Sequence, residues 1–98
     1  MSRLRIARSA VADLDEIWTY IAKKESPQAA GRFLNFLTNK LALLSGNPGL
    51  GRSRADLREG LRSFPVGNYR VYYRQEKEGI VRILYVRHAA RDEKKLFE

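Results

Sequence analysis

Apolar and polar residues alternate along 61–74, LRSFPVGNYRVYYR, in two short runs that Gly67-Asn68 separates. Both runs are rich in β-branched and aromatic residues, and a Gly-Asn pair suits the two-residue turn of a β-hairpin. Pairing that steps outward from this turn gives the opposing pairs Val66–Tyr69, Phe64–Val71 and Arg62–Tyr73. One face of the hairpin is then almost wholly apolar. The other face carries Pro65, Arg70, Tyr72 and Arg74.

Two segments before the hairpin have the period of amphipathic helices. In the first, apolar residues recur at the spacing i, i+3, i+4 and i+7, as Leu14, Ile17, Trp18 and Ile21. This spacing predicts a helix of about four turns with Trp18 in the core. We expect Ser9 to cap the helix and 23–25 to end it.

A second helix is predicted from about Pro27 to Leu44, with Ser26 as its cap. Its apolar stripe consists of Ala30, Phe33, Leu34, Leu37, Leu41 and Leu44. Because the joint is short, the two helices should form an antiparallel hairpin. Phe36 and Leu43 lie off the stripe, and we expect the sheet or a loop to cover them; contact with something beyond the partner helix is the alternative. The SGNPG string then ends the helix, because Gly and Asn suit a left-handed cap and Pro cannot continue it.

Two further strands complete the predicted sheet. Residues 3–7 alternate, with Leu4 and Ile6 expected to point inward, and 80–87 is apolar on both faces, as a central strand would be. Pro65 has no backbone donor, which puts the first hairpin strand at an edge of the sheet. The expected order across the sheet is first hairpin strand, second hairpin strand, last strand, N-terminal strand.

These elements predict an α+β fold in the order β-α-α-β-β-β. A helical hairpin packs on one face of a small, mainly antiparallel four-stranded sheet. A short C-terminal helical turn over 91–97 closes the chain, with Leu96 and Phe97 tucked back. At 98 residues the chain is expected to form a single domain, 1–98.

Charge narrows the class of partner. The chain has 19 basic and 11 acidic residues, a net charge of +8, which favours an acidic protein or a nucleic acid. Arginine outnumbers lysine by thirteen to six, and guanidinium groups favour fixed, bidentate contacts. With no cysteine and one histidine, no metal or cofactor is expected. No apolar run approaches the length of a membrane span, so we expect a cytoplasmic protein.

Few residues are candidates for chemistry. His88, near the end of the last strand, could act as an acid or base because imidazole titrates near neutral pH. A partly buried histidine that bonds to backbone where the strand ends is the plainer interpretation. The carboxylates Asp13, Asp15 and Glu16 fall early in a helix, where the helix dipole accounts for them. The arginines that could line a face for phosphate or carboxylate are Arg62, Arg70, Arg74, Arg82 and Arg87; solvated strand charges are the alternative.

Four strings along the chain carry a family resemblance. They are ADLDEIWTYIA at 12–22, NPGLGR at 47–52, LR-x-G-LRSFPVGNYRVYYR at 57–74 and RHAARD at 87–92. With the order strand, helix, helix and three strands, the chain resembles the ParE branch of the RelE/ParE superfamily of toxins from bacterial toxin-antitoxin pairs. The resemblance covers nearly the whole chain.

The resemblance implies the toxin of a type II toxin-antitoxin system, which arrests growth by binding and inhibiting DNA gyrase without chemistry of its own. It implies a ParD-like antitoxin with an acidic C-terminal segment, and binding to promoter DNA only as the toxin-antitoxin complex. The residues expected to bind antitoxin or target are Arg52, Arg58, Arg62, Arg70, Tyr72, Arg74, Arg82 and Arg87.

Two alternatives remain open. One is a ribosome-dependent mRNA endoribonuclease of the RelE type, with His88, Arg62 and Arg82 as catalytic residues. The string around His88 is typical of the ParE branch itself, so it does not favour cleavage. The other alternative is a plain nucleic-acid-binding module, which the net charge would permit.

Overall fold

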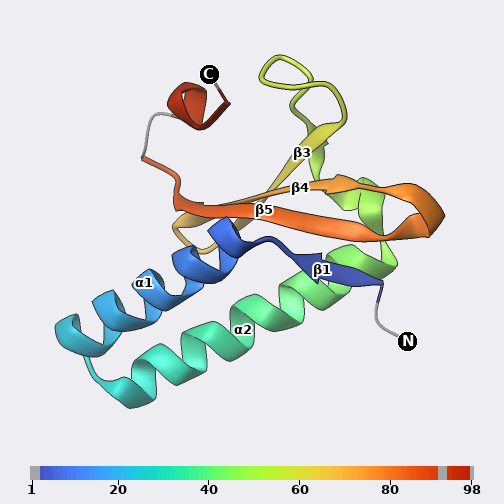
Figure 1. Ribbon diagram of the computed structural model, residues 1–98. Coiled ribbons are helices and arrows are strands. Elements are labelled where there is room, and N and C mark those ends of the chain that lie inside the picture. Colours follow the sequence, from blue (N-terminus) through green and yellow to red (C-terminus); the bar gives the residue numbers. More distant parts are fainter. Residues whose placement is uncertain (1–2, 91–92, 98) are drawn as a thin grey trace.

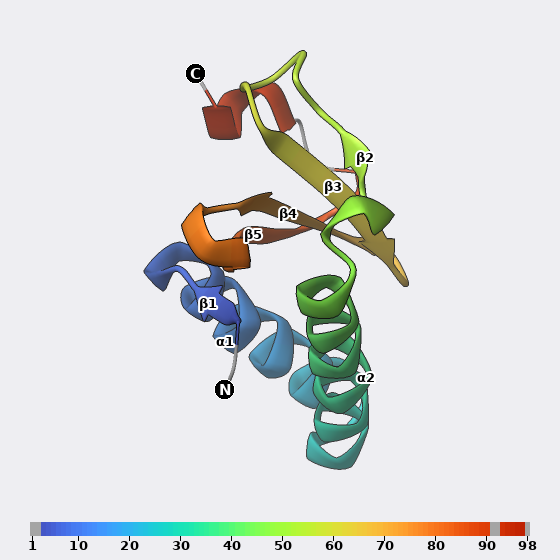
Figure 2. The same ribbon diagram turned by 90° about the vertical axis from the view of Figure 1, so that its right-hand side faces the viewer.

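A mixed sheet of five strands lies between two long helices on one side and a C-terminal turn on the other (Figures 1 and 2). The computed structural model describes residues 3–90 and 93–97. The strands are β1 (Leu4–Ile6), β2 (Arg52–Ser53), β3 (Leu61–Val66), β4 (Tyr69–Gln75) and β5 (Val81–His88). The helices are α1 (Arg8–Lys24) and α2 (Pro27–Gly46), with short 3₁₀ turns η1 (Pro48–Leu50), η2 (Lys77–Gly79) and η3 (Glu93–Phe97). We call the sheet face away from α1 and α2 the outer face.

The hairpin has the predicted register. Its opposing pairs are Val66–Tyr69, Phe64–Val71 and Arg62–Tyr73. Gly67 has a φ of 59°, which a two-residue hairpin turn requires and glycine adopts without strain. The order β1-β5-β4-β3-β2 confirms the predicted order of four strands. β1 runs parallel to β5, and the other neighbours are antiparallel.

The fifth strand, β2, is a difference from the predicted four-stranded sheet. It pairs Arg52 with Ser63 and Ser53 with Arg62. Two residues are too few to show an alternating pattern in the sequence. β2 pairs only with Arg62 and Ser63 of β3. Pro65, which has no backbone N–H, therefore still lies at an unpaired edge of β3, as predicted.

Strand β5 contains a β-bulge and has an apolar cluster on each of its faces. Tyr72 pairs with Tyr85 whereas Tyr73 pairs with Ile83, which leaves Leu84 as the extra residue. Ile83 therefore belongs to the core under the helices, and Leu84 joins Tyr72 in a second apolar cluster on the outer face.

Helix α1 begins differently from the prediction. It starts at Arg8, with Ala7 in the N-cap position and no side-chain cap, so the prediction that Ser9 caps the helix is wrong. The Ala7 N–H donates to the carbonyl oxygen of Ile83 (2.9 Å). The Ser9 hydroxyl donates to the carbonyl oxygen of Leu84 (2.6 Å). This end of α1 thus continues the hydrogen bonding of β1 along the edge of β5.

Trp18 lies outside the core, contrary to the prediction. It is 42% exposed, because the buried line of α1 passes through Asp13 and Ile17, about 100° around the helix from Trp18. A charged residue occupies a buried position that the apolar pattern could not indicate. Ile6, which was expected to point inward, is 37% exposed, whereas Leu4 packs against the core.

Helix α2 starts as predicted and ends differently. The Ser26 hydroxyl accepts a hydrogen bond from the backbone N–H three residues on (3.0 Å). At the other end Asn47 has a φ of −141°, so the expected left-handed cap is not formed. Phe36 and Leu43 are 47% and 43% exposed. The prediction that the sheet or a loop covers them is therefore wrong.

Apolar clusters cover both faces of the sheet. The larger lies between the sheet and the helices. The smaller, on the outer face, consists of Leu61, Tyr72 and Leu84. Leu96 and Phe97 of η3 pack against the smaller cluster, which confirms that the C-terminal turn is tucked back; its predicted first residue, Arg91, and the end of the RHAARD string lie outside the described residues. Among the helices described, none is long and apolar enough to cross a bilayer.

Candidate functional site

Three side chains share the carboxylate of Glu93 on the outer face. Arg54 donates from Nη1 to Oε2 (2.8 Å) and from Nη2 to Oε1 (2.6 Å), which makes a bidentate pair. Arg70 Nη1 (2.8 Å) and the Tyr72 hydroxyl (2.6 Å) both donate to Oε2. We call these four residues the Glu93 cluster. It joins the C-terminal turn to β4 and to the loop that follows β2.

Charge and burial fix the protonation states in the Glu93 cluster. Hydrogen bonds from Arg54 lower the pKa of Glu93 to about 2, with further lowering by Tyr72 and Arg70. Arg54 is only 5% exposed, and its hydrogen bonds to Glu93 and then Asp56 raise its pKa. Burial raises the pKa of Tyr72, and the adjacent Glu93 raises it further. The carboxylate is therefore ionised, and the tyrosine neutral, throughout the physiological range.

An aromatic side chain of the same turn packs beside this cluster. The Phe97 ring is edge-on to Tyr72 and Tyr85, with centroids 5.5 and 5.6 Å away. The guanidinium of Arg58 lies over the Phe97 ring at 5.1 Å. The outer face thus binds a carboxylate together with an aromatic ring from the same short segment.

The carboxylate of Glu76 accepts hydrogen bonds from two more of the predicted arginines. Arg74 donates from Nη2 (2.9 Å) and Nε (3.1 Å) to its Oε2, and Arg82 donates from Nε to its Oε1 (3.0 Å). Hydrogen bonds from Arg82 and then Arg74 lower the pKa of Glu76. The two arginines face each other across β4 and β5, and their side chains are 42% and 35% exposed.

The remaining predicted residues lie elsewhere. Arg62 donates from Nη1 to the carbonyl oxygen of Gly51 (2.7 Å) and so holds the turn before β2. Arg52 is exposed on β2. Arg87 donates from Nε to Asp13 on α1 (3.0 Å). Five of the predicted arginines therefore bond to internal acceptors, namely Arg62, Arg70, Arg74, Arg82 and Arg87. The role of the predicted arginines in binding a partner stays a prediction.

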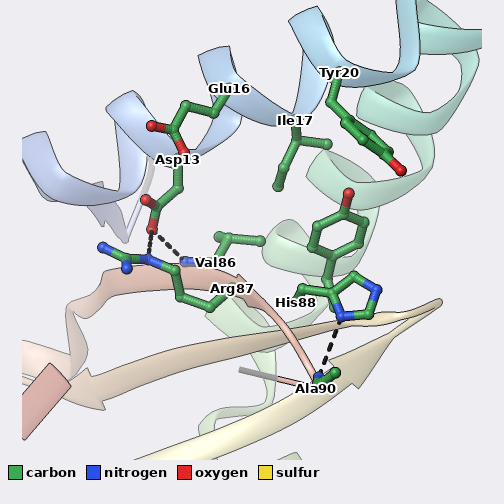
Figure 3. A pocket seen from close by; sticks show the side chains of 9 residues that line it. Asp13, Glu16, Ile17, Tyr20, Val86, Arg87, His88 and Ala90 are labelled. Carbon is green, nitrogen blue, oxygen red and sulfur yellow. Dashed lines mark hydrogen bonds and ion pairs between the residues drawn. The ribbon is translucent and has the colours of Figure 1, made fainter. Parts of the chain in front are cut away.

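A pocket of about 400 Å³ opens on the helix side of the sheet, between α1 and the end of β5 (Figure 3). Asp13 lies at one end, where its Oδ2 accepts the Val86 N–H (2.9 Å) and the Nε of Arg87 (3.0 Å). β1 pairs with β5 only as far as Ile83, so Asp13 provides the acceptor that a longer β1 would have supplied. No acidic residue lies in the first turn of α1, so the helix dipole does not explain Asp13.

The candidate residues of the nuclease alternative do not meet. Arg82 and His88 lie near opposite ends of β5, about 20 Å apart at the usual rise of a strand, and Arg62 is on β3. The Nδ1 of His88 accepts the Ala90 N–H (3.2 Å), and its ring lies edge-on to Tyr69 at 5.6 Å. His88 thus bonds to backbone at the strand end, although it is exposed rather than partly buried.

Sequence reasoning missed Arg54 and Glu93, which are central to the outer face. They are 39 positions apart, and only the fold brings them together. The one local signal is the Asp56 carboxylate two residues after Arg54, which accepts from Nε (3.1 Å) and Nη2 (2.9 Å). The loop around Arg54 is polar and contains both basic and acidic residues, so its sequence does not indicate that one guanidinium is buried.

A solved structure shares this architecture. The structure described as "Chromosomal ParDE TA system from P. aeruginosa" matches with a TM-score of 0.74 at 26% identity, over 90% of this chain and 95% of that chain. The two-helix hairpin packed on a mixed sheet therefore gives this chain the α+β fold of a protein from a toxin-antitoxin system.

Sequence comparisons specify the family. "Toxin ParE1" and "Toxin ParE3" of Caulobacter vibrioides are 33% and 36% identical over 86 and 81 residues, which cover 87% and 83% of this chain and 90% and 81% of those proteins. "Toxin ParE1" of Mycobacterium tuberculosis is 29% identical over 91 residues, 93% of each chain. The family model described as "ParE toxin of type II toxin-antitoxin system, parDE" matches residues 4–93. The chain belongs to this ParE family, which confirms the resemblance seen in its sequence.

Proposed function

We propose that this ParE toxin arrests growth in the cytoplasm by binding DNA gyrase, and that a ParD-like antitoxin neutralises it. The acidic C-terminal segment of the antitoxin docks on the outer face of the sheet. The toxin breaks no bond itself, and it contacts promoter DNA only as part of the complex with the antitoxin. The gyrase part of this proposal rests on the family.

The Glu93 cluster is the observation that supports antitoxin docking on the outer face. The chain's own Glu93 and Phe97 show which side chains this face can bind. Arginines and a tyrosine hydroxyl donate hydrogen bonds to the Glu93 carboxylate, and tyrosine rings pack against the Phe97 ring. An acidic peptide segment with an apolar residue nearby has the same chemistry. Around the cluster, Arg58 is exposed and Arg74 partly exposed, which leaves them accessible to a partner.

Separation of the nuclease candidates supports a toxin without chemistry. Acid-base catalysis needs the acid, the base and the cationic group within hydrogen-bond reach of one reacting phosphate. Arg82 and His88 are too far apart along β5 for this. We therefore expect His88→Ala to retain full toxicity.

Expression in cells tests the intracellular target. The toxin is expressed with and without the neighbouring reading frame, and plasmid supercoiling and transcript integrity are measured in the same cultures. We expect growth arrest only without the neighbour, with blocked supercoiling and intact transcripts. Transcripts cut within codons, together with loss of toxicity in His88→Ala, would instead establish the nuclease alternative.

Charge reversal tests the docking face. The double variant Arg70→Glu, Arg74→Glu should weaken the complex with the antitoxin by about 10- to 100-fold, since each tenfold loss is about 1.4 kcal/mol and both side chains are a third or more exposed. The matched control is Arg8→Glu, Arg32→Glu, which makes the same charge change at exposed positions on the helices. Equal affinities of the two double variants, measured by calorimetry, would place the antitoxin on another surface.

A further inference from the structure

The pocket beside α1 lies away from the Glu93 cluster and has no part in the proposed function. It is lined by apolar side chains at its base and by aromatic rings on its walls (Figure 3). Ile17 and Val86 form the base and are 5% and 2% exposed. Tyr20 and His88 flank it from α1 and the end of β5.

The aromatic walls are close to one another. Tyr69, at the start of β4, lies edge-on to His88 with ring centroids 5.6 Å apart. Burial raises the pKa of Tyr69, and the nearby Tyr20 raises it further. Two tyrosine side chains from different layers thus line the same pocket, and a flat group that enters it would meet aromatic rings.

The charge in the pocket is opposite to that of the protein as a whole. The Asp13 carboxylate is neutralised by Arg87 and by the Val86 N–H. Glu16 also lines the pocket, is exposed, and forms no ion pair within the described residues. In a chain of net charge +8, this pocket therefore presents an unpaired carboxylate beside aromatic rings.

A tyrosine ring of this pocket already has a cation of the chain itself beside it. Lys24 Nζ lies over the Tyr20 ring at 5.8 Å. A cation over a tyrosine face is favourable because the ring quadrupole is negative on its face.

We propose that this pocket receives an arginine side chain presented by a protein partner. The alkyl stem packs on Ile17 and Val86, the planar guanidinium stacks on Tyr20 and Tyr69, and Glu16 provides the counter-charge. Arginine fits better than lysine, because a flat, weakly hydrated head stacks on rings whereas an ammonium does not.

Other ligand classes fit less well. A phosphate would be repelled by the unpaired carboxylate of Glu16, whereas Arg87, the cation of the lining, already donates to Asp13. A metal ion would need more ligands, and within the part of the chain that the structure describes no three His, Asp or Glu side chains gather to hold one. An arginine from a partner satisfies both the apolar base and the unpaired carboxylate.

The test uses the ¹⁵N-labelled full-length chain and N-acetyl-arginine amide as the probe, followed by amide chemical shifts. N-acetyl-citrulline amide, which has the same shape without charge, is the matched ligand. We expect saturable shifts at residues 17, 20, 69, 86 and 88, with the arginine probe binding about tenfold more tightly than citrulline. Glu16→Gln should weaken arginine binding about fivefold. Tyr20→Leu should also reduce the preference for arginine, because it removes a ring and keeps the apolar volume.

The control variant is Glu25→Gln, which changes an exposed carboxylate at the far end of α1 and should leave binding unchanged. Both Glu16 and Tyr20 are exposed, so their variants should fold, and the unperturbed shifts elsewhere verify this. Equal binding of the two probes, or shifts with inorganic phosphate at the same residues, would overturn the proposal. A dimer of the isolated chain that Glu16→Gln dissociates would show that a second copy of the toxin, not a foreign partner, fills the pocket.

Discussion

Replacing Glu93 with Gln keeps the shape of the side chain and removes the charge that holds the Glu93 cluster together. In the native chain Oε2 accepts three hydrogen bonds and Oε1 accepts one. Glutamine offers one acceptor, and its NH₂ group would face a guanidinium. Arg54, which is 5% exposed, would keep only Asp56 as a charged partner.

The lowered pKa of Glu93 and the usual cost of breaking a buried ion pair predict similar losses of stability. The fall in the pKa of Glu93 from 4.5 to about 2 corresponds to about 3 kcal/mol at 1.36 kcal/mol per unit. Because 22% of the side chain is exposed, solvent screening reduces this to about 2 kcal/mol. Removing one partner of a buried ion pair usually costs about 3 to 5 kcal/mol. We expect Glu93→Gln to lower the free energy of unfolding by about 2 to 3 kcal/mol at neutral pH.

The pH dependence has a definite sign. Folding lowers the pKa of Glu93, so its stabilisation is complete above the unfolded value of 4.5 and is lost as the pH falls towards about 2. Urea unfolding of the wild type and of Glu93→Gln should therefore give free energies that converge across this window. Asp56 and Glu76 also have lowered pKa values, but both proteins contain them, so the difference isolates Glu93.

The control for this prediction is Glu59→Gln, at an exposed position in the loop before β3. It should change the free energy of unfolding by less than about 0.5 kcal/mol. If Glu93→Gln is equally mild, or if its loss of stability persists at the acid end of the window, the Glu93 cluster does not stabilise the fold through the charge of Glu93.

Two further substitutions test the packing. Gly51→Ala would place a methyl group 2.8 Å from the carbonyl oxygen of Ser63 and closer still to the Tyr73 ring. It should therefore lower the free energy of unfolding, measured by thermal melts, by about 1 to 3 kcal/mol. Gly49→Ala is the control, because its added methyl group has open space, and it should show no such loss in the same measurement. Trp18→Ala should lower the free energy of unfolding by less than about 1.5 kcal/mol, because Trp18 is 42% exposed. Replacing a buried tryptophan usually costs about 3 to 5 kcal/mol. A loss in that higher range, measured by urea unfolding, would mean that Trp18 belongs to the core.

The sequence predicts the hairpin well because its signals are local. A two-residue turn sets the register of β3 and β4, and Gly67 supplies the left-handed conformation that this turn requires. The β5 strand is apolar on both faces, which indicates a central position. Each of these conclusions depends on residues within a few positions of one another.

The errors share a physical cause, since they occur where distant polar groups decide the outcome. Asp13 is buried because β5 extends beyond the last residue paired with β1, so the Val86 N–H needs another acceptor, which Asp13 provides. This burial turns α1 so that Trp18 faces solvent. Ser9 also bonds to β5 and does not cap the helix, since its hydroxyl donates a hydrogen bond to the carbonyl oxygen of Leu84. A helical periodicity computed from apolar residues alone cannot include such contacts.

Internal ion pairs also change what the arginine-rich face can offer a partner. Arg70 and Arg74 point to the outer face as the sequence predicts, but each already has a carboxylate, Glu93 or Glu76. An acidic segment that docks there would exchange one carboxylate for another, so the net Coulombic gain is small. Affinity at such a face must then come mainly from geometry and from burial of apolar side chains beside the charges, in the way that Phe97 now packs on Tyr72. The net charge of +8 would act chiefly on the rate of encounter, because steering depends on the whole field and not on which cations are already paired.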